Sequence, residues 1–376
     1  MKVAILSTYL PNKCGIATYS NDLFKSLNEF NISNIDIIAI DSQELFEYPD
    51  EVKFIIDKNN ITHYETAAYF INVIYDVIII QHEFGIYGGT DGEFILNLFN
   101  KISIPIITNF HTLLYPPSTN QKRIIQEIAN KSTIVTLMTQ RAVNILLDMI
   151  QIDSKKIRLI PHGVPSFDIS QRSARLILNF KKSTFILLSF GFLGRGKGFE
   201  TAIEAVTKIQ YDNFIYIILG TTHPNVLKHE GEAYRELLIN KSIKLGIQDK
   251  IIFIDEFASE EKLKTYLSAT DMYVTPYPNE NQISSGTLSF AVGAGAAVIS
   301  TPYIYAKDLL ANDVGILFDF NDSNALANNI NQLIQNPQKL KYYRNQAKNL
   351  GNTMIWSIVA QQHFNILNLL NKQNDS

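Results

Sequence analysis

The chain has 376 residues, of which 46% are hydrophobic, and its formal net charge at pH 7 is −3. This length and composition are sufficient for two globular domains, each with its own apolar core. The near-neutral charge gives no general attraction to nucleic acid, so we expect no nucleic-acid partner and only a local anion site. The single cysteine, Cys14, excludes an internal disulfide and a cysteine-rich zinc site, and it favours a reducing compartment.

The N-terminal residues MKVAILSTYLPNKCG predict a buried strand followed by a polar loop, and not a signal peptide. Uncharged apolar runs elsewhere are shorter than the ~18 residues of a membrane span. Even residues 70–80 are interrupted by Asp76. We therefore expect a cytoplasmic protein without membrane spans.

Short apolar, β-branched runs recur along the chain, with helical segments between them. The predicted strands are residues 3–6, 35–40, 77–80, 104–108, 133–137, 185–189, 214–219, 251–254, 272–275 and 297–300. Strands that are apolar on both faces and alternate with helices favour parallel sheets. We therefore predict an α/β protein with two doubly wound, Rossmann-like parallel-sheet domains.

The pattern of strands and helices lapses between residues 161 and 182, which contain two prolines and a basic pair, and we predict a linker there. The first domain is then residues 1–165 and the second is residues 166–353. Residues 354–376 carry apolar side chains at helical spacing and predict a helix that returns to the first domain. Because ligands bind beyond the carboxyl ends of parallel strands, the polar loops of both domains should line one cleft.

Polar segments of the first domain provide several candidate site residues. Gly15 stands just before a predicted helix, where glycine either lets a ligand approach the backbone or makes a simple turn. The segment QHEFGIYGG, with His82 and Glu83, is too polar for packing alone and belongs on the rim of a cleft. A later strand ends in NFHT and brings His111 to the same edge, although a structural role is commoner for such a histidine. We rank it above His162, which lies in the turn PHGVP.

The second domain contains two candidate phosphate-binding segments. The run 271–303 predicts a strand, a polar loop, a helix start and a second strand. Hydroxyls and free backbone N–H groups at a helix start bind anions such as phosphate. These residues are Ser284, Ser285, Gly286 and Thr287. The glycine-rich turn FGFLGRGKG adds two cations, Arg195 and Lys197, which suit a diphosphate, although a solvated basic turn is the alternative.

The sequence gives no pattern for a metal ion. Two histidines and three glutamates lie in GTTHPNVLKHEGEAYRE, but their spacing matches neither HExxH nor another compact ligand set. D-x-D is absent from the chain, so the usual carboxylate pair for a divalent ion on phosphates is missing. We predict a metal-independent site without a cofactor.

Together these segments resemble retaining glycosyltransferases of the GT-B fold, in particular glycosyltransferase family 4 (group 1). The resemblance covers essentially the whole chain, from Gly15 and His111 through GFLGRGKG to GAGAAVIS and the terminal helix. It implies an acceptor-side first domain and a nucleotide-sugar-binding second domain that face each other across a cleft. In this family a lysine near the start of the second domain binds the donor diphosphate, and Lys197 matches that position.

The chain departs from the family at two places. The usual arginine position is occupied by Phe192, so Arg195 would have to reach the same phosphates from elsewhere. The two carboxylates of the E-x7-E motif map to Gln282, which can still bind sugar hydroxyls, and to Phe290, which cannot bind a ribose diol. The chain is thus similar to a subgroup with QxSSGTL in place of the acidic motif.

The resemblance implies retaining transfer of a hexose from a UDP- or GDP-sugar to a saccharide, lipid-linked or other glycoconjugate acceptor, as in polysaccharide biosynthesis. Arg195 and Lys197, with the N–H groups of residues 285–287, would stabilise the charge on the diphosphate. His111 would lie beside the sugar. Glu256 and Phe257 would lie near the base, and the acceptor would contact the loops that contain His82 and Glu83.

Several alternatives stay open from the sequence. The same fold serves sugar epimerases and phosphorylases, although no lysine is singled out for the pyridoxal cofactor of the latter. The altered acidic motif also fits a non-catalytic nucleotide-sugar-binding partner protein. Residues 339–348, KLKYYRNQAK, suggest a weak peripheral contact with the inner membrane face, but a solvated helix face is the favoured interpretation. The sequence does not predict the oligomeric state.

Overall fold

The computed structural model describes residues 1–41 and 46–374, so the last two residues of the predicted terminal segment lie outside the described residues. The chain divides into two compact units. The first unit comprises residues 1–163, residues 281–284 and the C-terminal segment from Trp356. The second comprises Val164–Glu280 and Ser285–Ile355.

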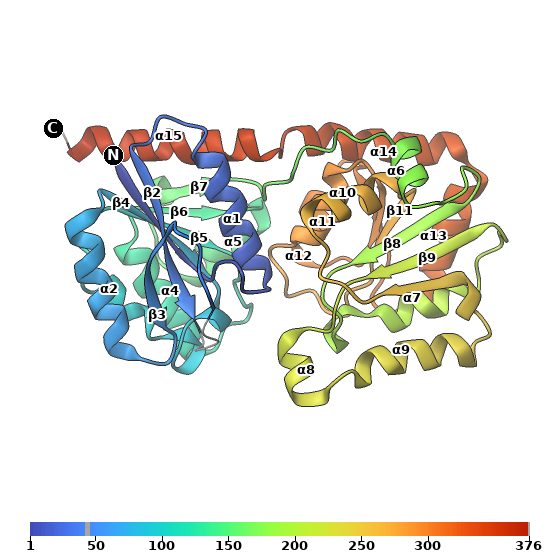
Figure 1. The fold of residues 1–376 in the computed structure, drawn as a ribbon, viewed down its shortest axis with the longest axis horizontal. Helices are drawn as coiled ribbons and strands as arrows, with labels where there is room; N and C mark the ends of the chain where they lie inside the picture. The colour runs from blue at the N-terminus through green and yellow to red at the C-terminus, as the bar shows by residue number, and fades with distance from the viewer. Residues whose placement is uncertain (42–45, 375–376) are drawn as a thin grey trace. The chain divides into compact units, whose positions relative to one another are not determined.

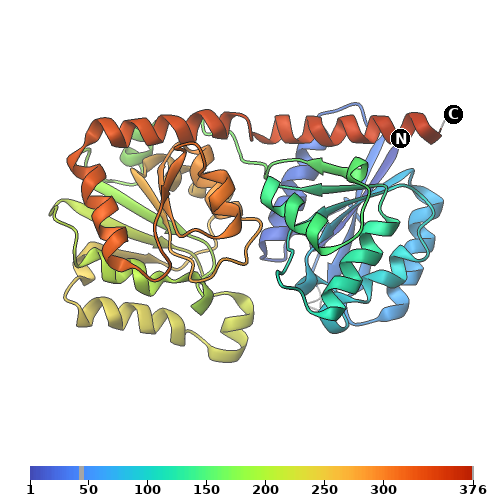
Figure 2. The same cartoon turned by 180° about the vertical axis from the view of Figure 1, so that it is seen from behind.

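Among the described residues, seven parallel strands form the sheet of the first unit in the order β3-β2-β1-β4-β5-β6-β7. The strands are β1 (Lys2–Ser7), β2 (Asn34–Asp41), β3 (Val52–Asp57), β4 (Val77–His82), β5 (Ile106–Phe110), β6 (Ile134–Leu137) and β7 (Ile157–Leu159). The helices are α1 (Gly15–Leu27), α2 (Ile61–Ile74), α3 (Ile95–Phe99), α4 (Thr119–Lys131), α5 (Gln140–Met149) and α15 (Trp356–Asn374). Helices cover both faces of this sheet, as the opposite views in Figures 1 and 2 show.

The described part of the second unit has six parallel strands in the order β10-β9-β8-β11-β12-β13. The strands are β8 (Phe185–Phe190), β9 (Phe214–Leu219), β10 (Ile251–Ile254), β11 (Met272–Thr275), β12 (Ala297–Ser300) and β13 (Gly315–Leu317). The helices are α6 (Gln171–Ile177), α7 (Phe199–Val206), α8 (Pro224–Glu230), α9 (Ala233–Lys244), α10 (Glu260–Ala269), α11 (Gly286–Gly293), α12 (Ile304–Leu309), α13 (Ser323–Gln335) and α14 (Pro337–Asn352). The prediction of two doubly wound parallel-sheet domains is confirmed.

The burial of each strand explains which ones the sequence predicts. Central strands such as β4 are buried at every position and therefore form continuous apolar runs. The patterns do not predict β3, β7 and β13, which lie at sheet edges and are only partly buried. An edge strand does not need to be apolar on both faces, so its sequence carries a weaker signal.

The end of α7, the packing of α15 and the lengths of the helices complete the description of the fold. Helix α7 ends at Val206, after which the backbone continues in i→i−3 turns. The terminal helix α15 packs against α1 and β4 within the first unit. None of the helices in the described part of the chain is both long and apolar enough to cross a membrane.

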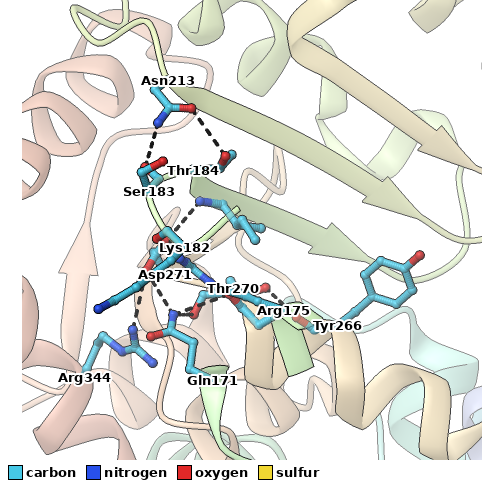
Figure 3. A network of polar contacts seen from close by, with 12 residues as sticks. Gln171, Arg175, Lys182, Ser183, Thr184, Asn213, Tyr266, Thr270, Asp271 and Arg344 are labelled. Atoms are coloured by element: carbon cyan, nitrogen blue, oxygen red, sulfur yellow. Dashed lines mark hydrogen bonds and ion pairs between the residues drawn. The ribbon is translucent and has the colours of Figure 1, made fainter. Parts of the chain in front are cut away.

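The predicted linker 161–182 is wrong in one respect, because it contains the helix α6. Ser170 caps this helix by accepting from the N–H of Ser173 at 3.1 Å. Arg175 anchors it to the sheet, since its guanidinium donates to the carbonyls of Ala269 and Lys182 at 3.0 and 2.7 Å. Figure 3 shows these contacts converging on one buried arginine.

Asp271 is the acceptor at the centre of the same network (Figure 3). Its carboxylate accepts from Arg175 at 2.5 Å and from Gln171 at 3.0 Å. It also accepts the backbone N–H of Ile186 in β8 at 2.8 Å, and Arg344 of α14 lies 3.5 Å away. One carboxylate just before β11 therefore ties α6, β8 and α14 together.

Replacing this carboxylate should destabilise the second unit strongly. In Asp271→Asn, Arg175 loses its charged partner while it stays buried, so we expect the free energy of unfolding to fall by about 3 kcal/mol. Urea unfolding followed by circular dichroism measures this loss. The solvent-accessible pair between the partly buried Lys264 and the exposed Glu260 provides the control, because Glu260→Gln should cost under ~0.5 kcal/mol. Equal losses in the two variants would contradict a special role for Asp271.

Candidate functional site

His111 follows β5 in the first unit, and a neighbouring glutamine fixes its ring. Gln81, on the adjacent strand β4, accepts from His111 Nε2 at 2.8 Å and from Asn109 Nδ2 at 3.1 Å. Because an amide oxygen can only accept, the His111 proton lies on Nε2 and the lone pair on Nδ1. Burial, with smaller contributions from His162 and His82, lowers the pKa of His111 to about 3. The ring is therefore a neutral imidazole at physiological pH.

The backbone of His111 is also held at both ends. Its N–H donates to the carbonyl of His82 at 2.9 Å. Its carbonyl accepts from the hydroxyl of Ser284 at 2.8 Å. Gln282 donates in turn to the carbonyl of Ser284 at 3.0 Å. The segment Asn281–Ser284 is part of the first unit, so Gln282 and Ser284 are grouped with His111.

Tyr19 of α1 packs edge-on against three aromatic groups of the first unit. Ring centroids lie 4.8 Å from His111, 5.2 Å from His162 and 5.1 Å from Trp356. His162 shares a 2.7 Å hydrogen bond with the carbonyl of Gly163, and burial lowers its pKa to about 4 despite that bond. His162 thus has the packing role that its turn sequence favours.

His82 is buried at 1% exposure, in contrast to the expected position on a rim. Its ring packs against Phe84, Tyr87 and Phe110, and neither ring nitrogen has a hydrogen-bond partner among the described residues. Burial lowers the pKa of His82 to about 3. In this structure His82 therefore offers no surface to an acceptor, and only Glu83 of that predicted pair is partly exposed.

Glu83 and Gly15 lie on loops of the same unit. The Glu83 carboxylate accepts from the Thr112 hydroxyl and from the Gly85 N–H, and burial raises the pKa of Glu83 despite these bonds. Gly15 begins α1 after an unusual cap, in which Cys14 Sγ accepts from the N–H of Ala17 at 3.2 Å. A Cβ at Gly15 would meet no protein atom within 4 Å, so the local packing does not require glycine.

In the second unit, the turn after β8 carries two basic residues and lies against the loop after β11. Gly198 has φ 68°, and a Cβ there would lie 1.9 Å from the carbonyl oxygen of Pro276. Only glycine permits this close approach of two backbones. The basic residues, Arg195 and Lys197, form a single 3₁₀ turn directly before it.

Arg195 and Lys197 have different partners. Arg195 is 57% exposed and forms a 3.2 Å ion pair with Glu230. Lys197 Nζ lies 4.3 Å from the centroid of the Tyr277 ring. Within residues 1–41 and 46–374, no carboxylate lies within ion-pair distance of Lys197. Lys197 therefore keeps an unneutralised positive charge.

The start of α11 presents free backbone donors. Ser285 caps the helix by accepting from the N–H of Leu288 at 3.3 Å. Among the described residues, the N–H groups of Gly286 and Thr287 have no acceptor. The Thr287 hydroxyl is shared with Ser285 at 3.2 Å and with Tyr277 at 3.3 Å. Free donors and the helix dipole make this end attractive to an anion.

The sequence analysis missed an aromatic cluster at the ends of β8, β9 and β10. Phe192 lies 5.5 Å from Phe257 and 5.2 Å from His223 by ring centroids. Phe257 is 38% exposed. Burial and the nearby Lys197 charge lower the pKa of His223, whose Nδ1 caps α8. The sequence signal for this cluster was Phe192, an aromatic residue at the position where the family that the chain resembles has arginine.

Glu256, predicted near the base, forms an ion pair with Lys262 of α10. In the part of the chain that the structure describes, no group of three or more His, Cys, Asp or Glu side chains could hold a metal ion. His223, Glu230 and Glu232 of the histidine- and glutamate-rich segment are instead a helix cap and ion-pair partners of arginines.

The predicted site residues fall into two sets. Those in the first unit are Gly15, His82, Glu83, His111, Gln282 and Ser284, and those in the second are Arg195, Lys197, Glu256, Phe257, Ser285, Gly286 and Thr287. Within each unit, the contacts above connect Ser284 to His111 and Lys197, through Tyr277, to Thr287. That both sets act on one substrate stays a prediction.

The second set of predicted site residues lies in a part of the chain that matches a known protein family. Residues 170–350 match the family model of "Glycosyl transferases group 1", and this range contains both phosphate-binding candidates. The chain is a glycosyltransferase, and over residues 170–350, just under half of its length, it is similar to group 1 of these enzymes. No curated protein sequence is similar enough to this glycosyltransferase to count as a match.

Solved structures of low sequence identity share its fold along nearly the whole chain. HepE from Anabaena, in complex with UDP and glucose, is 16% identical with a TM-score of 0.77, over 98% of this chain and 99% of that one. Sucrose-phosphate synthase from Thermosynechococcus elongatus is 16% identical with a TM-score of 0.81, over 99% of each chain. A glycosyltransferase from Rickettsia africae is 16% identical with a TM-score of 0.77, again over 99% of each. The fold of this glycosyltransferase is GT-B.

Acid should destabilise the first unit, because four of its histidines are buried and have a lowered pKa. They are His82, His111, His162 and His363. The unfolded chain binds protons on them below about pH 6.5, while the folded unit stays neutral until pH 3–4, so stability falls as the pH drops through this window. Fluorescence of Trp356, the single tryptophan, reports unfolding of this unit.

One variant isolates this effect away from the candidate site. His363 of α15 is fully buried, and its ring nitrogens have no partner among the described residues. His363→Leu should reduce the slope of stability against pH below 6.5 by about a quarter, without loss at neutral pH. The exposed His229 serves as control, since His229→Leu should leave the slope unchanged. An unchanged slope in His363→Leu would refute the role of this buried histidine in acid destabilisation.

Proposed function

We propose that this glycosyltransferase transfers a hexose from a UDP- or GDP-sugar to a saccharide, lipid-linked or other glycoconjugate acceptor, with retention and without a metal ion. The observation that carries the proposal is the pairing of an unneutralised Lys197 with the free N–H groups at the start of α11, within one unit. Both elements suit a diphosphate. The HepE structures, which are complexes with UDP or UDP-glucose, support the uridine nucleotide.

Charge stabilisation is the main contribution of the second unit in this proposal. As the bond to the sugar breaks, negative charge grows on the diphosphate. Lys197 and the N–H groups of Gly286 and Thr287 are positioned before this charge develops, so little reorganisation is needed. Arg195 can also bind the diphosphate when it exchanges Glu230 for a phosphate oxygen, because breaking an exposed ion pair costs little free energy. These groups supply positive charge from the chain's own residues.

We assign His111 to the sugar. Its neutral ring donates Nε2–H to Gln81, which leaves Nδ1 as an acceptor for a sugar hydroxyl. The nearby carboxylate of Glu83 accepts from Thr112 and Gly85, so it is already engaged. We therefore favour same-face displacement over a covalent intermediate on a carboxylate.

The contacts with the base and the acceptor are assigned from the exposure of side chains. Phe257 presents a partly exposed ring for stacking on the base, beside Glu256. Acceptor contacts are assigned to the first-unit loops 12–18 and 81–91, where Glu83 is partly exposed. We place the enzyme in the cytoplasm, in the synthesis of a polysaccharide or glycoconjugate. The basic stretch 339–348 contains Arg344, which is held by Asp271 and the Gly295 carbonyl. We therefore favour a helix face without a membrane role for this stretch.

Nucleotide binding tests the donor site. We expect UDP or GDP to raise the melting temperature of the wild type, with or without EDTA. Lys197→Ala should weaken that nucleotide about 10- to 100-fold, as expected for one charge-assisted contact. Lys181→Ala removes an exposed lysine before β8 and should leave binding unchanged. Binding of no nucleotide, or equal effects of the two substitutions, would overturn the assignment.

Turnover tests His111. His111→Ala should lower the rate of sugar release from the donor identified above on the order of 100-fold, since a positioned transition-state contact is lost. Its affinity for the nucleoside diphosphate should stay within about twofold, because no phosphate contact is removed. Hydrolysis of the donor, measured with water as acceptor, avoids any assumption about the natural acceptor. An equal loss of affinity for the nucleoside diphosphate would contradict the assignment of His111 to the sugar.

A further inference from the structure

Tyr277 connects the two elements that the proposed function assigns to the diphosphate. The face of its ring carries the ammonium of Lys197 at 4.3 Å. Its hydroxyl lies 3.3 Å from the hydroxyl of Thr287, in the first turn of α11. One side chain therefore contacts both the cation and the helix start.

Tyr277 is itself held firmly. It is 6% exposed, and its ring stacks on Tyr303 with centroids 5.1 Å apart and planes at 28°. Its carbonyl accepts from the hydroxyl of Thr301 at 2.7 Å. Thr301 also donates its N–H to the carbonyl of Thr275 at 3.0 Å. Backbone, ring and hydroxyl are thus fixed by different neighbours, so the ring face has one orientation.

An aromatic face suits a lysine that must bind an anion. The ring quadrupole attracts the ammonium and restricts its position, but it does not neutralise the charge. A carboxylate partner would neutralise the charge and would have to be displaced by the ligand, as Glu230 would be from Arg195. Gly198 makes this arrangement possible, because its missing Cβ lets the 276–278 loop approach the turn that carries Lys197.

We propose that Tyr277 is a positioning residue that holds Lys197 beside the start of α11, so that the ammonium and the helix start bind the same diphosphate. The proposal rests on the proposed function and adds a residue that the sequence motifs above do not name. Tyr277 does not contact the reacting sugar. Its effect passes through Lys197, and it should be visible mainly in ligands that carry a second phosphate.

The experiment compares UDP with UMP on the full chain by calorimetry, with GDP and GMP if the enzyme prefers guanosine. Tyr277→Leu removes the ring face and should lower the diphosphate-to-monophosphate affinity ratio about five- to tenfold. Tyr277→Phe keeps the face and should retain the ratio within about twofold. In a Lys197→Ala background, Tyr277→Leu should have no further effect on the ratio, because the two residues act through one contact.

A further substitution keeps the shape of the side chain in case Tyr277→Leu does not fold. Pentafluorophenylalanine at position 277 reverses the ring quadrupole, so it should lower the ratio while Phe does not. An unchanged ratio in both Tyr277→Leu and the fluorinated variant would overturn the proposal, as would additive effects of Tyr277→Leu and Lys197→Ala. Failure of the wild type to bind any nucleoside diphosphate would instead overturn the proposed function together with it.

Discussion

The close approach of two backbones at Gly198 and Pro276 is the constraint on which the candidate donor site depends. A side chain at position 198 would overlap the Pro276 carbonyl, so the turn after β8 and the loop after β11 can meet only at a glycine. The meeting places Lys197 over Tyr277 and, through Tyr277, beside the start of α11. Strands β8 and β11 are neighbours in the sheet, and this is where the strand order reverses. The site therefore follows from the topology as well as from the motif.

The two units use charge in opposite ways. In the first unit, burial keeps four histidines neutral, as the lowered pKa values of His111 and His162 show. A neutral imidazole can accept from a sugar hydroxyl, which an imidazolium cannot do. In the second unit, Lys197 rests on an aromatic face at a partly exposed turn, without a carboxylate partner among the described residues. Neutral groups would thus face the sugar and positive groups the phosphates, which matches where charge develops in glycosyl transfer.

Much of the fold could be predicted from the sequence because most strands are buried on both faces and leave apolar runs. The exceptions, β3, β7 and β13, are edge strands whose burial is partial. At the site, motifs predicted Lys197 and the start of α11, since glycines and hydroxyls there have few structural uses. They could not predict Gln81 or Tyr277, whose roles arise from contacts across neighbouring strands and loops. The expected exposure of His82 was also wrong. The polar character of the segment around His82 does not reveal that its ring points into an aromatic cluster.

Strand β11 shows how stability and function are separated within the second unit. Its N-terminal end follows Asp271, whose carboxylate holds α6, β8 and Arg344 of α14. Its C-terminal end leads, after four residues or about 13 Å of extended chain, into the loop that carries Tyr277. The strand pairs with β12 along its length and with β8 at Met272 and Tyr273, so the buried network at one end fixes where the loop begins at the other. Substitutions at Asp271 should therefore act on folding and those at Tyr277 on the phosphate site, because a rigid strand transmits position while the side chains at its two ends share no contact.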